Sequence, residues 1–509
     1  MNIVIVGGGT AGWLAALMIS KIKSEHTVTV IESSAIGIIG AGEGSTGLLT
    51  SILKNEMWDF GCNLLDFFQE TGATLKYGIH HKDWKTVGKS YMGPIGGTPS
   101  TEQVVDYIFA HYHSTDPENV HLSSIIGQKI ERKISNFNKK TLSFDSMGTA
   151  LHFDAHDVGR YFKKLAMKTL QVSVIDDEVL DVNLNSENGN ILSVLLKTGQ
   201  LVNGDFFVDA SGFKQVLMKK LNAKWISYKE NLPVNSAMPF LLPLEDDEIP
   251  ELYTTAWAQS SGWMWQIPNQ QRKGCGYVFD DNFITADQAQ AEIETTLGRP
   301  IDPIRVLKFD TGRLANAWEK NCLAIGLSAA FAEPLEATSI HTTIAQLLTF
   351  VIEFLHSDLE TTLNPGSRNS YNRRTAKLYD TTKEFLIAHY MGGRTDSEFW
   401  KYVSSGATKT EFVDNLLTMC KTQMPSNRDL DISFGTPDMG LWSYVLAGVG
   451  HLTPETSAKV FSGNTVPVIG LADINGVIKT YQDTLDNMMA DNLSYSDFVK
   501  FLRKTSKRP

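Results

Sequence analysis

The chain has 509 residues and a formal net charge of -11, with 46 lysines and arginines against 57 aspartates and glutamates. An acidic surface repels phosphate backbones, so we expect no nucleic acid among the partners and favour a small molecule as ligand. The length suits about three domains, or one large enzyme core with a helical extension.

The four cysteines are far apart and form no CxxC pair. This spacing argues against a disulfide framework and a thiolate metal site, and it fits a reducing cytoplasm. The first apolar strand begins directly after the initiator methionine, which leaves no room for a signal peptide. The most apolar stretch, Thr342 to Leu355, is interrupted by polar residues and predicts a buried helix. We therefore expect no membrane span and a cytoplasmic location.

The N-terminal residues predict the start of a βαβ unit. The predicted strand Ile3-Val4-Ile5-Val6 runs into Gly7-Gly8-Gly9-Thr10-Ala11-Gly12, which fits the pattern G-x-G-x-x-G. A helix over Trp13–Ile22 and a second strand over Thr27–Ile31 follow. Small residues in such a loop let backbone amides and a helix N-terminus approach a pyrophosphate. Glu32 closes the second strand at the spacing of a carboxylate that binds a ribose hydroxyl, so the unit predicts a dinucleotide site.

Later segments add further predicted contacts. The stretch Ile39-Gly40-Ala41-Gly42-Glu43-Gly44-Ser45-Thr46 is rich in small residues, which let a backbone lie close to a planar ring. A helix over Val158–Leu170 and a strand over Ile191–Leu196 follow. Phe206-Phe207-Val208-Asp209 then leads into Ala210-Ser211-Gly212, a second segment that we expect to contact a nucleotide.

The string Gly262-Trp263-Met264-Trp265-Gln266-Ile267-Pro268 places two tryptophans one residue apart between glycine and proline. On a strand, both indoles would point to the same face. The sequence after about residue 350 is mainly helical through residue 430, and residues 465–509 add a helical tail. The basic run at its end, Arg503 to Arg508, is expected to be solvated.

Two further sequence motifs are informative, namely Thr74-Leu75-Lys76-Tyr77-Gly78 and Phe331-Ala332-Glu333-Pro334-Leu335-Glu336. With the glycine loop and the paired tryptophans, they closely resemble the flavin-dependent halogenases of the tryptophan halogenase family, whose signature is GWxWxIP. The resemblance implies an α/β fold with an FAD-binding, Rossmann-like core of the monooxygenase type, mixed sheets and a mainly helical C-terminal subdomain. It places the core at residues 1–355, with substrate-side insertions near 80–150 and 230–300, and the helical subdomain that completes the substrate side at 356–509.

In this family, reduced FAD and O2 convert a halide ion to hypohalous acid, which halogenates an electron-rich aromatic substrate. The resemblance implies that Lys76 delivers the acid and that Glu336 orients it and accepts the ring proton. It also implies that the backbone amides of Thr338 and Ser339 bind the halide. The other implied residues are the flavin/substrate separators Trp263 and Trp265 and the FAD contacts Gly7, Gly9, Thr10, Ala11, Gly12, Glu32, Ala41, Gly42, Glu43, Asp209, Gly212 and Gly326.

The expected partners follow from the same resemblance. A second G-x-G-x-x-G unit is not visible in the sequence, so we expect a separate NAD(P)H-dependent flavin reductase to supply the reduced flavin. The other partners are a halide ion and a small aromatic substrate, without a metal ion. The oligomeric state stays open, with a homo-oligomer as one option.

The sequence departs from the family pattern at two places. It reads Glu336-Ala337-Thr338-Ser339 where the family usually has Glu-Ser-Thr-Gly, and this change predicts a preference for bromide and iodide over chloride. It reads Gly93-Pro94-Ile95 at the likeliest counterpart of a His-Pro-Phe string that stacks on the indole in tryptophan-specific members. The missing rings predict a broad substrate range in which free tryptophan is a poor substrate.

Three alternatives share parts of these patterns. A flavin-dependent aromatic monooxygenase, or hydroxylase, would use the same frame without needing Lys76, Glu336 and the tryptophan pair together. His152-Phe153-Asp154 has the H-x-D spacing of a non-haem iron site, which the βαβ opening disfavours. The pairs His80-His81 and His111/His113 are interpreted as ordinary side chains. A non-catalytic flavin-binding protein is the third alternative.

Overall fold

The computed structural model describes residues 1–36, 42–54, 58–95, 102–144, 149–170, 172–245, 247–461 and 474–507. A six-stranded sheet has the order β10-β2-β1-β14-β23-β22. Its strands are β1 (Asn2–Val6), β2 (Thr27–Glu32), β10 (Ser173–Asp176), β14 (Phe206–Asp209), β22 (Trp318–Glu319) and β23 (Cys322–Ala324). The strands β10, β2, β1, β14 and β23 pair in parallel, which places their carboxyl ends at one edge.

The turn from β1 into α1 (Thr10–Ile22) is the predicted glycine loop. Gly7 has φ 119°, and a Cβ there would lie 2.2 Å from the carbonyl oxygen of Ala210, so only glycine fits. Gly9 caps α1 without a side-chain hydrogen bond to the first turn. The first N–H groups of α1 therefore stay available for a ligand. The predicted strand–turn–helix–strand order is confirmed.

A seven-stranded sheet forms the second layer, in the order β20-β16-β19-β18-β17-β5-β6. Its strands are β5 (Gly78–Lys82), β6 (Ser90–Pro94), β16 (Ser236–Pro243), β17 (Tyr253–Gln259), β18 (Gly262–Pro268), β19 (Arg272–Phe279) and β20 (Leu307–Lys308). β17 pairs with β18 antiparallel and with β5 parallel, so the sheet is mixed, as expected. Trp263 and Trp265 lie on β18 with their ring centroids 6.4 Å apart.

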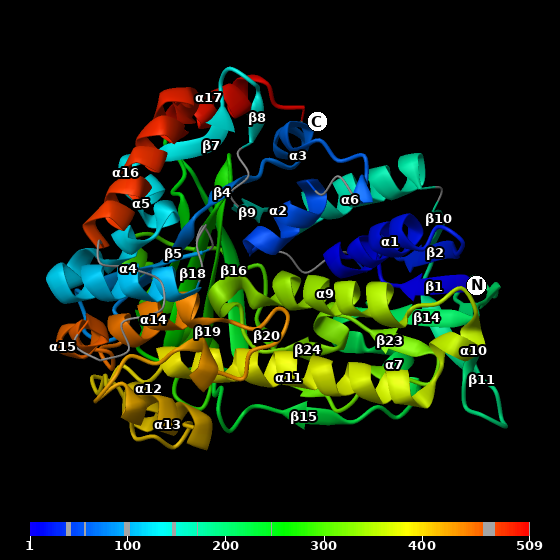
Figure 1. The fold of residues 1–509 in the computed structure, drawn as a ribbon. Helices are drawn as coiled ribbons and strands as arrows, with labels where there is room; N and C mark the ends of the chain where they lie inside the picture. The colour runs from blue at the N-terminus through cyan, green and yellow to red at the C-terminus, as the bar shows by residue number, and fades with distance from the viewer. Residues whose placement is uncertain are drawn as a thin grey trace.

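Helices α9 (Thr338–Thr349) and α11 (Pro365–His389) run beside the two sheets (Figure 1). The predicted buried helix over Thr342 to Leu355 is confirmed as α9 and its continuation η6 (Phe350–Phe354). Within the described residues, one helical segment, Leu335–Phe354, is long and apolar enough to cross a membrane by length and composition, and 67% of its most apolar window is buried. It is longer than expected because η5 (Leu335–Ala337) and η6 extend α9 at both ends.

Smaller elements connect and cover these sheets. The helices are α2 (Gly47–Lys54), α3 (Leu64–Thr71), α4 (Glu102–Thr115), α5 (Ile125–Arg132), α6 (Ala155–Thr169), α7 (Val216–Lys220), α8 (Ala286–Leu297) and α10 (Leu359–Thr362). The strands are β3 (Glu43–Gly44), β4 (Thr74–Lys76), β7 (Ile134–Asn138), β8 (Ser143–Phe144), β9 (Ala150–Phe153), β11 (Val179–Leu184), β12 (Ile191–Leu196), β13 (Leu201–Asn203), β15 (Trp225–Ser227), β21 (Gly312–Leu314) and β24 (Ala330–Phe331). The predicted helix near Val158 is α6, which begins earlier because Asp154 caps it.

The C-terminal part is mainly helical, as expected. Its elements are α12 (Glu398–Ser404), α13 (Glu411–Met419), α14 (Met439–Gly448), α15 (Pro454–Ala458), α16 (Ile474–Asp491), β25 (Asn492–Ser494) and α17 (Tyr495–Lys504). β25 pairs with β7, α16 lies beside α5, and α17 lies beside α3 and β7 (Figure 1). The expectation of a solvated basic tail is wrong for Arg503, whose guanidinium donates to the carbonyl oxygens of Glu248 and Gln270.

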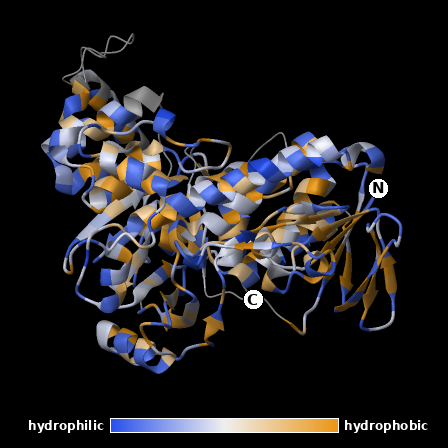
Figure 2. Ribbon diagram, turned by 90° about the horizontal axis from the view of Figure 1, so that it is seen from below, coloured by the Kyte–Doolittle hydropathy of each residue, from blue (hydrophilic) through white to orange (hydrophobic). Residues whose placement is uncertain are grey.

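Hydrophobic side chains explain why the parts pack together. The strands are largely hydrophobic, whereas hydrophilic and hydrophobic residues alternate along the helices (Figure 2). Such helices bury one face against a sheet and leave the other in water. One core cluster joins Trp263 of β18 and Ile79 of β5 to residues of α11, α12 and α14, so the C-terminal helices share a core with the seven-stranded sheet.

Gly276→Val is expected to destabilise the fold. Trp265 lies directly on Gly276 across the β18–β19 pair, and a Cβ at position 276 would lie 2.1 Å from the indole. Overpacking of this kind costs about 1–3 kcal/mol. Urea unfolding followed by circular dichroism would measure the lower free energy of unfolding.

The matched control for this variant is Gly93→Ala, on β6 of the same sheet. The nearest atom to a Cβ at Gly93 is 3.6 Å away, an ordinary contact, so we expect a change within about 0.5 kcal/mol. Equal stability of Gly276→Val and the unmodified protein would contradict the placement of Trp265.

Candidate active site

One cavity of about 790 Å³ brings most of the sequence-predicted motifs together. The predicted residues that line it are Gly7, Gly9, Thr10, Ala11, Glu32, Gly42, Glu43, Lys76, Gly212, Trp263, Trp265, Gly326, Glu336, Thr338 and Ser339. Gly12 and Asp209 do not line the cavity, and Ala41 lies outside the described residues. The nucleotide segments and the Lys76/Glu336 region are thus parts of one continuous site.

Asp209 lies behind the residues that line the cavity and supports one of their turns. Its buried carboxylate accepts hydrogen bonds from the backbone N–H groups of Leu217 and Met218 and from Ser211. These bonds fix the turn that presents Gly212 to the cavity. Sequence reasoning found the right segment, but the side chain that shapes it faces the protein.

Two helices open into the cavity with uncapped N-termini. The N-cap of α1 is Gly9 and the N-cap of α9 is Ala337, and neither makes a side-chain hydrogen bond to its helix. The unpaired N–H groups and the helix dipole make such an end attractive to anions. Glu32, which receives a hydrogen bond from Lys163, lies near the first of these ends. The cavity therefore has two anion positions, as a dinucleotide and a halide would need.

Lys76 ends β4 and is fully buried. Its Nζ donates to the carbonyl oxygen of Ser45 at 3.1 Å. Burial lowers the pKa of Lys76 to about 8, and the charge of Glu336 partly opposes this shift. An amine with a pKa in this range can exchange its proton near neutral pH.

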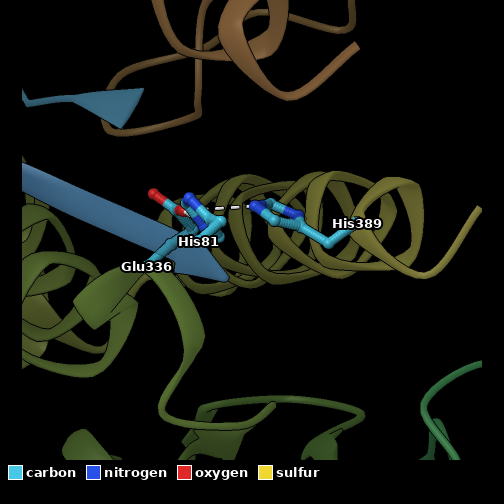
Figure 3. A group of neighbouring side chains, drawn as sticks. All are labelled: His81, Glu336 and His389. Carbon is cyan, nitrogen blue, oxygen red and sulfur yellow. Dashed lines mark hydrogen bonds and ion pairs between the residues drawn. The ribbon is translucent and has the colours of Figure 1, made fainter. Parts of the chain in front are cut away.

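Glu336 is held by two histidines (Figure 3). Its Oε1 is 3.0 Å from Nε2 of His81 on β5 and 3.1 Å from Nε2 of His389 at the end of α11. Burial alone would raise the pKa of Glu336, but the contacts with His389 and His81 outweigh it and hold the pKa well below its ordinary value. The carboxylate is therefore ionised in a site from which water is largely excluded.

The backbone at this point is strained. Glu336 has φ 65° and Ala337 has φ 53°, left-handed values that cost residues other than glycine about 1–3 kcal/mol each. Ser339 lies in α9 and has no such strain, although the family usually has glycine there. The strained turn points the Glu336 side chain at the cavity and starts α9 directly afterwards.

Glu333 fixes the indole of Trp263. Its Oε2 accepts hydrogen bonds from the hydroxyl of Tyr390 at 2.8 Å and from Nε1 of Trp263 at 3.4 Å. Burial raises the pKa of Glu333 to about 7, against the effect of both hydrogen bonds. This arrangement gives Glu333 a structural role beside Trp263.

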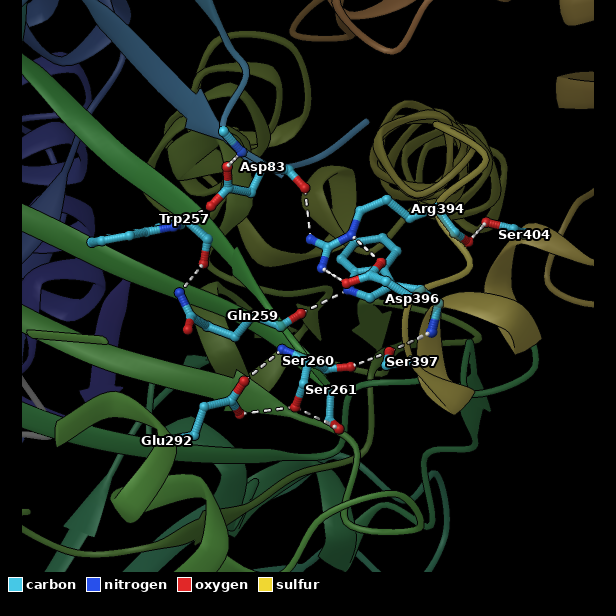
Figure 4. Close-up of polar contacts among 12 residues, drawn as sticks. Asp83, Trp257, Gln259, Ser260, Ser261, Glu292, Arg394, Asp396, Ser397 and Ser404 are labelled. Carbon is cyan, nitrogen blue, oxygen red and sulfur yellow. Dashed lines mark hydrogen bonds and ion pairs between the residues drawn. The ribbon is translucent and has the colours of Figure 1, made fainter. Parts of the chain in front are cut away.

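A polar network ties the histidine-bearing elements together (Figure 4). Arg394, just beyond α11, donates to the carbonyl oxygen of Asp83, just beyond β5, at 2.6 Å. The same guanidinium binds both carboxylate oxygens of Asp396. Trp257 of β17 donates to the Asp83 carboxylate at 2.6 Å. These bonds set the end of α11 against β5, and thus His389 against His81.

Sequence reasoning missed both histidines. His81 follows Lys76 closely on the next strand, but the His80-His81 pair was interpreted as ordinary side chains. His389 stands far along the chain, and no motif marks it. The iron site at His152 and Asp154, which the sequence disfavoured, is not formed, because His152 pairs with Thr254 at 2.9 Å whereas Asp154 caps α6 and pairs with Arg272.

The stretch 93–95 runs from the end of β6 and carries no aromatic ring. Tyr91, earlier on the same strand, instead stacks on His81 with ring centroids 4.4 Å apart and an interplanar angle of 7°. An aromatic side chain therefore does lie beside Glu336, at a position that the string comparison did not indicate.

Comparison with known proteins agrees with this geometry. The sequence model described as tryptophan halogenase matches residues 2–463. Tryptophan 7-halogenase RebH of Lentzea aerocolonigenes is 30% identical, with 95% of this chain and 96% of that protein covered. Tryptophan 6-halogenase SttH of Streptomyces toxytricini is 30% identical, with 93% and 92% covered.

Solved structures give the same result. The crystal structure of the tryptophan 6-halogenase SttH from Streptomyces toxytricini superposes with a TM-score of 0.85 and 26% identity, covering 98% of this chain and 99% of that one. The expected α/β fold with an FAD-binding, Rossmann-like core and the expected FAD dependence are confirmed. The chain belongs to the tryptophan halogenase family of flavin-dependent halogenases.

Proposed function

We propose that this enzyme uses reduced FAD, O2 and a halide ion to make hypohalous acid, which Lys76 delivers to an electron-rich aromatic substrate. The observation that supports this proposal most directly is that the buried side chains of Lys76 and Glu336 line the same cavity as the glycine loop before α1. A separate NAD(P)H-dependent flavin reductase supplies the reduced flavin. The substrate range is broad, and free tryptophan is a poor substrate.

The residues fit FAD. The uncapped N-terminus of α1 suits its pyrophosphate, and Glu32 suits a ribose hydroxyl. Gly42 and Gly212 border the same cavity and allow a ring to approach their backbone. Bound reduced FAD, together with O2, would supply the oxidising power that converts halide to hypohalous acid.

The chain's own residues perform the remaining steps. The N–H groups of Thr338 and Ser339 at the start of α9 hold the halide. The Lys76 ammonium donates a hydrogen bond to the oxygen of hypohalous acid and directs the halogen to the substrate. Glu336 orients the acid and takes the proton that the ring releases. Trp263, fixed by Glu333, stands with Trp265 between flavin and substrate and excludes water.

A product screen tests this proposal. Phenols, indoles and free tryptophan are each incubated with a flavin reductase, NADH, FAD and one halide, and the products are analysed by mass spectrometry. We expect halogenated products from several substrates, with tryptophan among the poorest. Oxygenated products that form without halide would instead assign a hydroxylase, and no product at all would favour a non-catalytic flavin-binding protein. A wide margin in favour of tryptophan would contradict the broad range.

Lys76→Ala is expected to abolish halogenation while oxidation of reduced FAD continues, because the lysine acts after oxygen has reacted. In the unmodified enzyme, halogenation should fall as the pH rises through about 8, since the ammonium form of Lys76 is then lost. Chromatographic product yield and oxygen consumption, measured in parallel, check both expectations. Normal yield from Lys76→Ala would remove the residue from the mechanism.

We also propose that the enzyme prefers bromide and iodide to chloride. Ala337 gives the halide position no hydroxyl, so the desolvation of small, strongly hydrated chloride is less well offset. Equimolar competition, corrected for free hypohalous acid, should yield mainly the heavier halides. Ala337→Ser with Ser339→Gly should restore chloride use, and Ala337→Ser alone should achieve most of this because Ser339 is unstrained. Predominant chlorination by the unmodified enzyme would contradict the proposal.

A further inference from the structure

Both ring nitrogens of His389 face hydrogen-bond acceptors. Nδ1 lies 2.9 Å from the carbonyl oxygen of Phe385, one turn earlier in α11, and Nε2 lies 3.1 Å from Glu336 Oε1. A carbonyl oxygen cannot donate, so Nδ1 carries a hydrogen. A neutral imidazole has no second N–H. The contact with Glu336 therefore requires one more proton, either on Nε2 or on the carboxylate.

We propose that this proton resides on His389, which is a stable imidazolium that keeps the buried Glu336 carboxylate ionised, with His81 as a neutral second donor. His389 is then a positioning residue, because it acts on the reaction only through Glu336. The role that we assign to it in turnover rests on the proposed function, whereas its protonation state does not.

Two other buried glutamates show what happens without a direct hydrogen bond to a histidine. Burial, with a smaller contribution from the charge of Asp154, raises the pKa of Glu43 to about 7. Burial also raises the pKa of Glu333 to about 7, although hydrogen bonds from Tyr390 and Trp263 and the more distant charge of His389 lower it. Glu336 is buried as well, yet its pKa lies well below its ordinary value. The histidine contacts are what distinguishes it from the other two carboxylates.

His81 donates without a charge. Its Nε2 is 3.0 Å from Glu336 Oε1, whereas Nδ1 is buried and has no hydrogen-bond partner in the described part of the chain. A hydrogen on Nε2 and a bare Nδ1 define the neutral tautomer. Burial also lowers the pKa of His81, which disfavours a second proton. The two histidines thus have different protonation states at the same oxygen atom.

Distance alone would also permit a metal ion, because the ligand atoms of His81, Glu336 and His389 lie within 4.8 Å of one another. A metal bound to Nε2 of His81 would move its hydrogen to Nδ1, where the nearby backbone of Ile79 is not placed for a well-formed hydrogen bond. Histidines that bind metals almost always give this N–H a partner. Hydrogen bonding accounts for the cluster without an ion.

Glu336 must be ionised to accept the proton that the substrate ring releases. Both histidines contact Oε1 of Glu336, and no described residue forms a hydrogen bond with Oε2. Glu336 also lines the cavity. As the halogen–oxygen bond of hypohalous acid breaks and the carbon–halogen bond forms, Lys76 protonates the departing hydroxide to give water. Oε2 accepts the proton that the ring carbon releases, and this proton then returns to Lys76. A Glu336 that was already protonated could not take part.

The first test reads the protonation state in the resting protein and needs no turnover. With histidine labelled with 15N, the rings of the 12 histidines are compared at pH 8, where an ordinary imidazole with a pKa of about 6.5 is neutral. We expect a ring with both nitrogens protonated that disappears in His389→Gln and persists in His81→Gln. A neutral His389, or a stoichiometric metal ion bound to both rings, overturns the proposal.

The second test uses the pH dependence of halogenation. His389→Gln keeps a donor for Glu336 but loses the charge, so the carboxylate should titrate near 7, as Glu43 and Glu333 do. Relative to the unmodified enzyme at the same pH, its kcat should then fall about tenfold from pH 8 to pH 6, with KM little changed. His81→Gln, in which one neutral donor replaces another, should follow the unmodified enzyme, whose kcat rises slightly in this interval as Lys76 gains its proton.

The other titratable groups around the pair must be separated from this pattern. They are Lys76 on β4, His81 on β5, Tyr91 on β6 and Glu333 before η5. Lys76 loses its proton only as the pH rises, and burial raises the pKa of Tyr91 well above its ordinary value. Glu333 has a pKa of about 7 and also responds to the charge of His389, so the loss is assigned to Glu336 only if it persists when His389→Gln is combined with Glu333→Gln.

The outcomes separate the two proposals. If the unmodified enzyme makes no halogenated product, the proposed function fails, while the labelled rings still decide the state of His389. If halogenation occurs and His389→Gln keeps the unmodified pH profile, the inference about His389 fails alone. Should His389→Gln not fold by circular dichroism, His389→Asn replaces it in the first test, which needs only the loss of the imidazole signal.

Discussion

A buried negative charge must be compensated, and this requirement organises the catalytic end of the cavity. The Glu336 side chain is only 8% exposed, and both histidines that hold it are fully buried. One histidine comes from the seven-stranded sheet and the other from the end of α11. The helix and the sheet must therefore dock before the carboxylate is stable as an anion, and the Arg394–Asp83 contact fixes that docking. Removal of one partner from such a buried pair is strongly destabilising.

Glu336 carries a negative charge, whereas the rest of the cavity favours anions. The protein as a whole carries a net charge of -11, yet α1 and α9 both direct uncapped N-termini into the cavity. α1 begins at the carboxyl edge of the parallel strands, where open α/β sheets usually bind ligands. Backbone dipoles at short range, together with the basic side chains of Lys76, Lys214 and Arg305, thus make this cavity a suitable host for a pyrophosphate and a halide.

A single strained turn links the two halves of the site. Glu336 and Ala337 both have left-handed backbones, and α9 starts at the next residue. The turn consequently sets the carboxylate and the first amides of α9, which we propose bind the halide, at a fixed separation. Left-handed strain at residues other than glycine persists only where surrounding contacts hold it. Here those contacts are the two histidines on Glu336 and the burial of Leu335.

Local sequence patterns were sufficient to predict the βαβ unit at the N-terminus, the strand β18 with its two tryptophans, the buried helix α9 and the helical C-terminal part. Periodicity, glycine spacing and apolar runs act over a few residues, so the sequence carries them directly. The string resemblance likewise located Lys76, Glu336 and the α9 amides. It could not reveal that Asp209 faces inward, that β25 pairs with β7, or that Tyr91 stacks on His81. The partnership of His81, Glu336 and His389 also arose only on folding, because it joins residues from a strand, a turn and a helix end. Such contacts depend on how distant elements pack, and no short-range pattern encodes that packing.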